Sequence, residues 1–74
     1  MPKFRGIKPE DLIRALKRAG FVERRQRGSH LILSSEAGRL VVVPMHKGKD
    51  IPIGTLRGIL RDADLTPEDF EKLL

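Results

Sequence analysis

The spacing of apolar residues changes along the chain, from a helical period near the start to alternation in the middle. From Pro9 to Ala19, apolar side chains recur every three or four residues and charged side chains fill the positions between them. This pattern is typical of an amphipathic helix. Proline suits the first helical position, and Gly20 can adopt the left-handed conformation that ends a helix. We therefore expect a helix over 9–19.

Three short segments rich in β-branched or aliphatic residues follow, at 21–27, 29–34 and 39–44. They are separated by Gly28 and by a Glu-Ala-Gly sequence, and such punctuated segments predict an antiparallel meander of three strands. Side chains alternate between the two faces of a strand, so the leucines of the middle strand point to one face and His30 to the other. If helices cover the leucine face, His30 faces solvent.

The last third of the chain predicts two more helices. In "IPIGTLRGILRDADL", one side of a second helix carries Ile53, Leu56, Ile59 and Leu60. Thr66, followed by proline and two acidic residues, is typical of a helix start. We expect the apolar residues of this last segment to close the core: Leu65, Phe70, Leu73 and Leu74. The order predicts an α+β fold with the topology of a double-stranded-RNA-binding domain: helix, three-stranded antiparallel sheet, helix, and a short C-terminal helix.

Length and composition narrow the class of protein. The chain has 74 residues and no cysteine, which excludes disulfides and thiolate zinc sites. No repeat or linker divides it, so we expect a single domain over 1–74. The longest apolar run, 40–45, is too short to span a membrane, and the N-terminus lacks the apolar centre of a signal peptide. We expect a soluble cytoplasmic protein.

The charge is unevenly distributed. Fifteen Lys and Arg against ten Asp and Glu give a net charge of +5. Residues 1–61 hold fourteen basic and five acidic groups (+9), and residues 62–74 hold one basic and five acidic groups (−4). A basic body favours a polyanionic partner such as RNA. A solvated basic surface without a partner is the alternative.

The segment "RRQRGSHLIL" sets a histidine beside a basic cluster. The chain has no Gly-rich phosphate loop, and His30 and His46 with Asp50 make only a weak ligand set, so we expect no metal and no cofactor. RNA carries its own nucleophile, the 2′-hydroxyl. Its cleavage therefore requires only a base, an acid and positive charge near the phosphate, and a histidine can act as base or acid near neutral pH.

The residues around His30 suit this chemistry. Gly28 lets the backbone approach a phosphate closely, and the Ser29 hydroxyl can donate a hydrogen bond to a phosphate oxygen. We expect phosphate contacts from the cations nearby in sequence: Arg24, Arg25, Arg27, Lys47 and Lys49. Three readings remain open from the residues alone. In the first, His30 is a strand-edge histidine satisfied by a carbonyl. In the second, the domain binds RNA without cutting it, and in the third, the chain is a protein-interaction adaptor that uses its acidic tail.

Two longer stretches, "GFVERRQRGSHLIL" and "VVVPMHKGKDIPIGTLRGILRDADLTPEDF", resemble the HicA toxin family of bacterial toxin–antitoxin systems, also called YcfA-like proteins. The resemblance extends over 8–74. It rests on the "AGF" that ends the first helix, the Gly-Ser-His triplet, the "VP-x-H-K" turn and the "GTL-x-x-IL" helix. These motifs are individually short, and their order and spacing carry the resemblance.

The resemblance implies a small mRNA interferase, a ribosome-independent ribonuclease that acts on messenger or single-stranded RNA. It also implies the double-stranded-RNA-binding-domain-like fold and a HicB-type antitoxin protein as the neutralising partner. The catalytic histidine of the family is the one in the Gly-Ser-His triplet, which here is His30. Gly28 and Ser29 match the same triplet. The resemblance assigns no catalytic role to His46.

Overall fold

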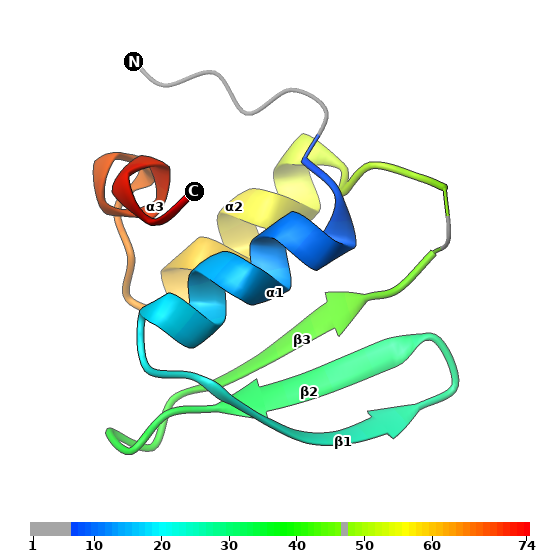
Figure 1. Cartoon of the computed structure of the whole chain (residues 1–74), viewed down its shortest axis with the longest axis horizontal. Helices are drawn as coiled ribbons and strands as arrows, with labels where there is room; N and C mark the ends of the chain where they lie inside the picture. The colour runs from blue at the N-terminus through cyan, green and yellow to red at the C-terminus, as the bar shows by residue number, and fades with distance from the viewer. Residues whose placement is uncertain (1–6, 47) are drawn as a thin grey trace.

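The protein folds into two layers, with helices on one side of a three-stranded sheet (Figure 1). The computed structural model describes residues 7–46 and 48–74. The elements are helix α1 (Pro9–Arg18), strands β1 (Val22–Arg27), β2 (His30–Ser34) and β3 (Leu40–Pro44), and helices α2 (Ile53–Asp62) and α3 (Pro67–Leu73). This order confirms the predicted α+β fold, and each boundary that the sequence predicts for the first helix and the strands lies within one residue of the observed one.

The sheet is an antiparallel meander in the order β1-β2-β3, so β2 is the central strand. Its first residue, His30, lies opposite Arg27 of β1 and Pro44 of β3. One irregularity interrupts the β1–β2 pairing, because the register shifts between Glu23 and Arg25. Arg24 is therefore an extra residue, as in a β-bulge, and period-2 alternation does not predict it.

Local chemistry accounts for the helix ends. Pro9 begins α1, and Gly20 follows its last turn with a φ of +100°, as expected for a left-handed helix terminator. At the start of α3, the Asp69 amide donates to the Thr66 hydroxyl at 3.0 Å. The Thr66 amide in turn donates to the Asp69 carboxylate at 3.4 Å. This reciprocal capping box confirms the predicted helix start.

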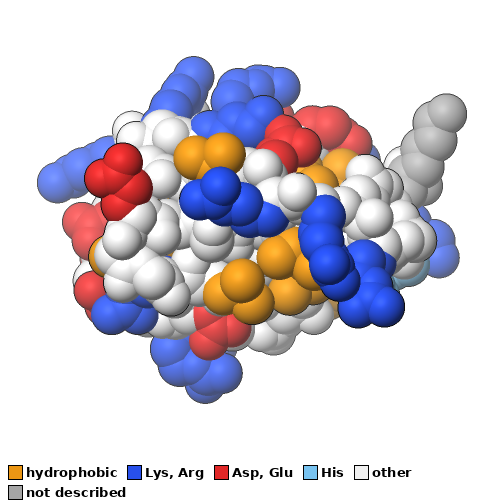
Figure 2. Space-filling model, turned by 90° about the horizontal axis from the view of Figure 1, so that it is seen from below, with side chains coloured by type: hydrophobic (Ala, Val, Ile, Leu, Met, Phe, Trp, Pro, Cys, Tyr) orange, Lys and Arg blue, Asp and Glu red, His pale blue; other side chains and the backbone are white. Residues whose placement is uncertain are grey.

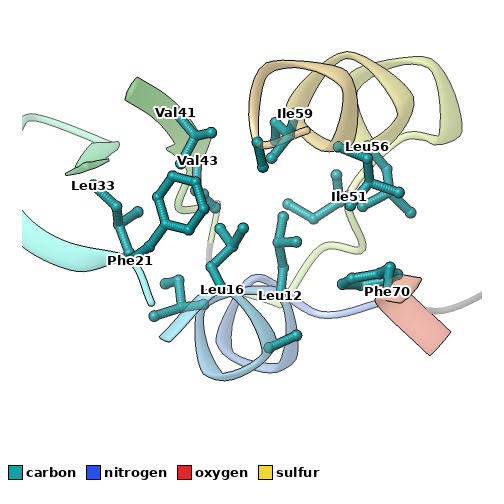
Figure 3. Packing of buried hydrophobic residues seen from close by; sticks show 14 of the residues in the cluster. Leu12, Leu16, Phe21, Leu33, Val41, Val43, Ile51, Leu56, Ile59 and Phe70 are labelled. Atoms are coloured by element: carbon teal, nitrogen blue, oxygen red, sulfur yellow. The ribbon is translucent and has the colours of Figure 1, made fainter. Parts of the chain in front are cut away.

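The core lies between the helices and one face of the sheet (Figure 3). Leu31 and Leu33 of β2 are buried, whereas the residues that alternate with them are not. All of the buried side chains in the described part of the chain are apolar. The largest fully buried ones come from both layers: Leu12, Leu16, Leu33, Val41, Val43, Leu56 and Phe70. Apolar packing on one face of the sheet therefore holds the fold together.

Two apolar residues that the sequence pattern groups with buried ones are exposed. Ile53 is 48% exposed, because Ile51, two residues earlier, fills the core at this end of α2. The Ile51 amide donates to the carbonyl of Ile7 at 2.8 Å, which holds the segment before α2 against the start of α1. Leu74 is 50% exposed because it lies beyond the end of α3, whereas Leu73 packs against the core.

Strand β1 lies farthest from the helices and has no buried residue (Figure 1). Even Val22 is 52% exposed. Its ladder with β2 holds it in place, and an ion pair between Lys17 of α1 and Glu23 connects it to the helical layer. None of the β1 side chains is thus buried on either face of the sheet.

Replacing Phe70 by alanine tests whether α3 belongs to the cooperative fold. Phe70 is fully buried, so Phe70→Ala should lower the free energy of unfolding by about 3–5 kcal/mol, measured by denaturant titration followed by circular dichroism. The matched control is Leu74→Ala, which removes a half-exposed side chain from the same segment and should change stability by less than about 0.5 kcal/mol. Equal denaturant concentrations at the unfolding midpoints of the two variants would show that α3 is not part of the cooperatively folding unit.

Candidate functional site

His30 lies on the open face of the sheet, away from the helices. It is exposed, while Leu31 and Leu33 of the same strand are buried, which confirms the predicted orientation. Its imidazole makes no hydrogen bond within the described part of the chain, so no protein carbonyl there satisfies it. Residues directly opposite each other in an antiparallel pair share a face. Arg27 and Pro44 therefore flank His30 on this surface.

A two-residue turn, Gly28–Ser29, joins β1 to β2 and holds His30. Gly28 has a φ of +57°. Ser29, the second turn residue, does not have a positive φ, because Asp64 is the one non-glycine residue with a positive φ among the described residues. Positive φ at the first turn residue alone is typical of a type II′ hairpin turn. A Cβ built at Gly28 meets no atom within 4 Å. The backbone before His30 is thus open to close approach by a ligand.

The three arginines of β1 share the open face with His30. Arg27 is opposite His30 and Arg25 is opposite Ile32. Arg24 donates from Nε to the hydroxyl of Ser34 at 2.6 Å, and Ser34 is on the same face as His30 by alternation along β2. The bulge at Arg24 explains this arrangement, because uninterrupted alternation would direct Arg24 and Arg25 to opposite faces.

This arginine row, defined as Arg24, Arg25 and Arg27, has no carboxylate partner among the described residues. The acidic residue nearest to it in sequence, Glu23, pairs instead with Lys17. The row extends along the exposed strand from the level of His30 (Arg27) toward Ser34 (Arg24). It forms a linear positive surface that the chain itself does not neutralise.

Lys49, a further predicted phosphate-contact residue, lies in the turn after β3. The Lys49 amide donates to the carbonyl of His46 at 3.1 Å, with Gly48 between them at a φ of +76°. The side chains of His46 and Lys49 are both exposed. No hydrogen bond or ion pair joins Lys49 to the arginine row within the described part of the chain. The predicted contact residue Lys47 lies outside the described residues.

An ion pair anchors the segment after this turn. Lys8, just before α1, lies 2.9 Å from the carboxylate of Asp50. The hydrogen bond and the charge of Asp50 raise the pKa of Lys8 above its usual value. Together with the Ile51 to Ile7 backbone bond, this pair connects the loop to the helical layer.

The open face also carries apolar side chains, but none of the described phenylalanines. Val42 lies opposite Ile32, and Val22 and Leu40 lie opposite Ser34. Val22, Leu40 and Val42 are each at least 40% exposed. The space-filling view from the sheet side shows Lys and Arg side chains beside this apolar surface (Figure 2).

Among the described residues, both phenylalanines are buried, and the sequence has no tyrosine or tryptophan. The charges of this surface are cations, which suit recognition of RNA phosphates.

Two further features bear on the class of site. Within the described residues, no three His, Asp or Glu side chains gather closely enough to hold a metal ion. None of the helices described here combines the length and apolar character needed to cross a bilayer.

Comparison with known proteins identifies one family. The family model described as HicA toxin of bacterial toxin–antitoxin matches residues 9–65, well over half of the chain. The matched region includes α1, the whole sheet and α2, and hence His30 and the arginine row. It ends before α3. No curated protein matches the sequence.

Alanine at Gly28 tests the strain that the turn imposes. An L residue at a φ of +57° is unfavourable even where space is open, so Gly28→Ala should destabilise the protein by about 1 kcal/mol. Gly58→Ala is the matched control. Gly58 lies inside α2, where a Cβ meets only ordinary contacts, and alanine there should stabilise the protein by about 0.5–1 kcal/mol. Shifts of the same sign in the two urea midpoints would contradict this account of the turn.

Proposed function

The chain belongs to the HicA toxin family of bacterial toxin–antitoxin systems, and on this basis we propose that it is a metal-independent endoribonuclease with His30 as a catalytic residue. One observation carries the proposal. An exposed histidine lies on the open face of the sheet, directly opposite Arg27 of an arginine row that no described carboxylate neutralises. The proposed substrate is messenger RNA.

The proposed reaction is an internal transesterification of RNA. The 2′-hydroxyl loses its proton to a base and forms a bond to the adjacent phosphorus atom, while the bond from phosphorus to the 5′-oxygen breaks. An acid donates a proton to that oxygen. The imidazole of His30 can perform either transfer near neutral pH. The products are a 2′,3′-cyclic phosphate and a 5′-hydroxyl, and the step uses no external nucleophile.

The arginine row supports binding of the scissile phosphate and its neighbours. Arg27 lies opposite His30, so its guanidinium can contact the phosphate that His30 acts on. Arg25 lies two residues along the strand, which is about 6.6 Å, and can contact the next phosphate. Ser29 and the open backbone at Gly28 complete the proposed contacts at the turn. Lys49 and Lys47 would add charge from the turn after β3.

An antitoxin partner follows from the family, since a toxin of this kind acts within a toxin–antitoxin pair. We propose that the partner is a HicB-type protein that presents carboxylates to the arginine row. Such a partner gains association rate from electrostatic steering toward a positive surface. It also excludes RNA phosphates from the same face, so inhibition is steric.

Loss of the imidazole tests the catalytic role. His30→Ala should reduce cleavage of a long transcript at least 100-fold, since general acid–base catalysis contributes about 10²–10⁴-fold. The assay contains EDTA, so that cleavage by wild type also tests metal independence. Because His30 is exposed, the variant should unfold at the wild-type urea concentration. Cleavage by the folded variant at the wild-type rate would disprove the assignment. A wild type that binds RNA without cutting it would favour the non-catalytic alternative.

Removing the arginine row tests phosphate binding. RNA affinity, measured in the His30→Ala background, should fall as salt rises, with a slope near −0.7 per phosphate contact for a single strand. Changing Arg24, Arg25 and Arg27 to glutamine should therefore flatten the slope of log affinity against log salt by about 2. The matched control changes three cations of the helical layer, Arg14, Arg18 and Lys72, and should leave the slope nearly unaltered. An equal effect of both triple variants would place the RNA elsewhere.

A further inference from the structure

The proposed reaction needs two proton transfers, one from the 2′-hydroxyl and one to the departing 5′-oxygen. A single imidazole cannot be a proton acceptor and a proton donor at the same moment. The chain has two histidines, and the chemistry proposed for His30 leaves the other, His46, unassigned. The location of His46 relative to His30 therefore decides whether it can take part in the reaction.

The pairing of β2 with β3 brings His46 to the same end of the sheet as His30. His30 is opposite Pro44, the last residue of β3. One residue further along, the Met45 amide donates to the carbonyl of Ser29, which extends the antiparallel pairing past the end of the strand. His46 is the next residue, so it lies alongside the turn that precedes His30.

The burial of Met45 favours a His46 side chain on the same side of the sheet as His30. Met45 is partly buried and packs against the core. In extended chain, the residues that flank an inward-facing one point outward, and His46 is exposed. Its carbonyl accepts the Lys49 amide at 3.1 Å, which fixes the backbone, while its imidazole makes no hydrogen bond or ion pair within the described part of the chain.

Strand dimensions place the two imidazoles within reach of one phosphodiester. Two residues along a strand and one strand spacing across give a Cα separation on the order of 8 Å between His30 and His46. Two side chains that extend toward a common point from this separation can contact the 2′-oxygen and the 5′-oxygen of a single phosphate. Arg27, directly opposite His30, adds a cation that suits phosphate binding.

We propose that His46 is the second catalytic residue, and that it performs the proton transfer that His30 does not. The proposal rests on the ribonuclease function proposed above. One imidazole accepts the 2′-hydroxyl proton as the new O–P bond forms, and the other donates its proton to the 5′-oxygen as the old P–O bond breaks. Exchange of protons with water then returns both imidazoles to their starting states, so the cycle balances without a further reagent.

The test combines His46→Ala with an RNA in which sulfur replaces the bridging 5′-oxygen at the cleavage site. A thiolate leaves without help from an acid, because a thiol is far more acidic than an alcohol. We expect His46→Ala to cut normal RNA at least 100-fold more slowly than wild type. Of the two variants, His30→Ala and His46→Ala, the one that lacks the acid should recover to within about tenfold of wild type on the sulfur substrate. The one that lacks the base should stay impaired. Added imidazole should partly restore His46→Ala on normal RNA, which a purely structural defect would not allow.

The control for disturbance of the loop is Asp50→Asn, which removes the ion pair to Lys8 and leaves both histidines in place. It should cut normal RNA within about twofold of wild type. Wild-type cleavage rates in folded His46→Ala would overturn the proposal while leaving the role of His30 intact. Failure of both histidine variants to recover on the sulfur substrate would also overturn it. If wild type itself does not cut RNA, the ribonuclease function has failed instead.

Discussion

Everything at this site depends on the fact that helices cover only one face of the sheet. A chain of 74 residues builds two layers, and its buried side chains lie between them. Alternation along β2 then requires that the residues between Leu31 and Leu33, and on either side of them, face solvent. The same packing that buries the leucines thus exposes His30. The core contributes to function by orientation, since it determines which side chains the open face presents.

Two small departures from regular strand geometry shape that face. The bulge at Arg24 brings a third guanidinium to the surface that Arg25 and Arg27 already occupy. The turn at Gly28, with its positive φ, reverses the chain in two residues, so that Arg27 and His30 become direct cross-strand neighbours. Without the bulge the positive charge would be divided between two faces. Without the tight turn, the histidine and the nearest arginine would not be paired.

Periodicity and end signals were sufficient to predict the fold. The alternation in β2, the glycine after α1 and the Thr66 capping box each report a local preference that the tertiary structure keeps. The sequence did not predict the bulge at Arg24, because the extra residue has no compositional signature. It also grouped Ile53 with Leu56, Ile59 and Leu60 on one side of the helix, since spacing alone cannot show that Ile51 fills that end of the core. The proximity of His46 to His30 depends on strand register, a long-range property that a local pattern does not contain.

Charge repulsion within the arginine row works against the stability of the fold. Arg25 and Arg27 lie on one face about 7 Å apart, and at that separation two like charges in water repel by about 0.6 kcal/mol. The strand that carries them buries no side chain of its own that could offset this repulsion. A polyanion converts the same charges into attraction, and so does a protein surface rich in carboxylates. Under the proposed function, RNA and antitoxin therefore bind to the same unpaired positive charges. The antitoxin inhibits cleavage because it occupies the surface that attracts the RNA phosphates.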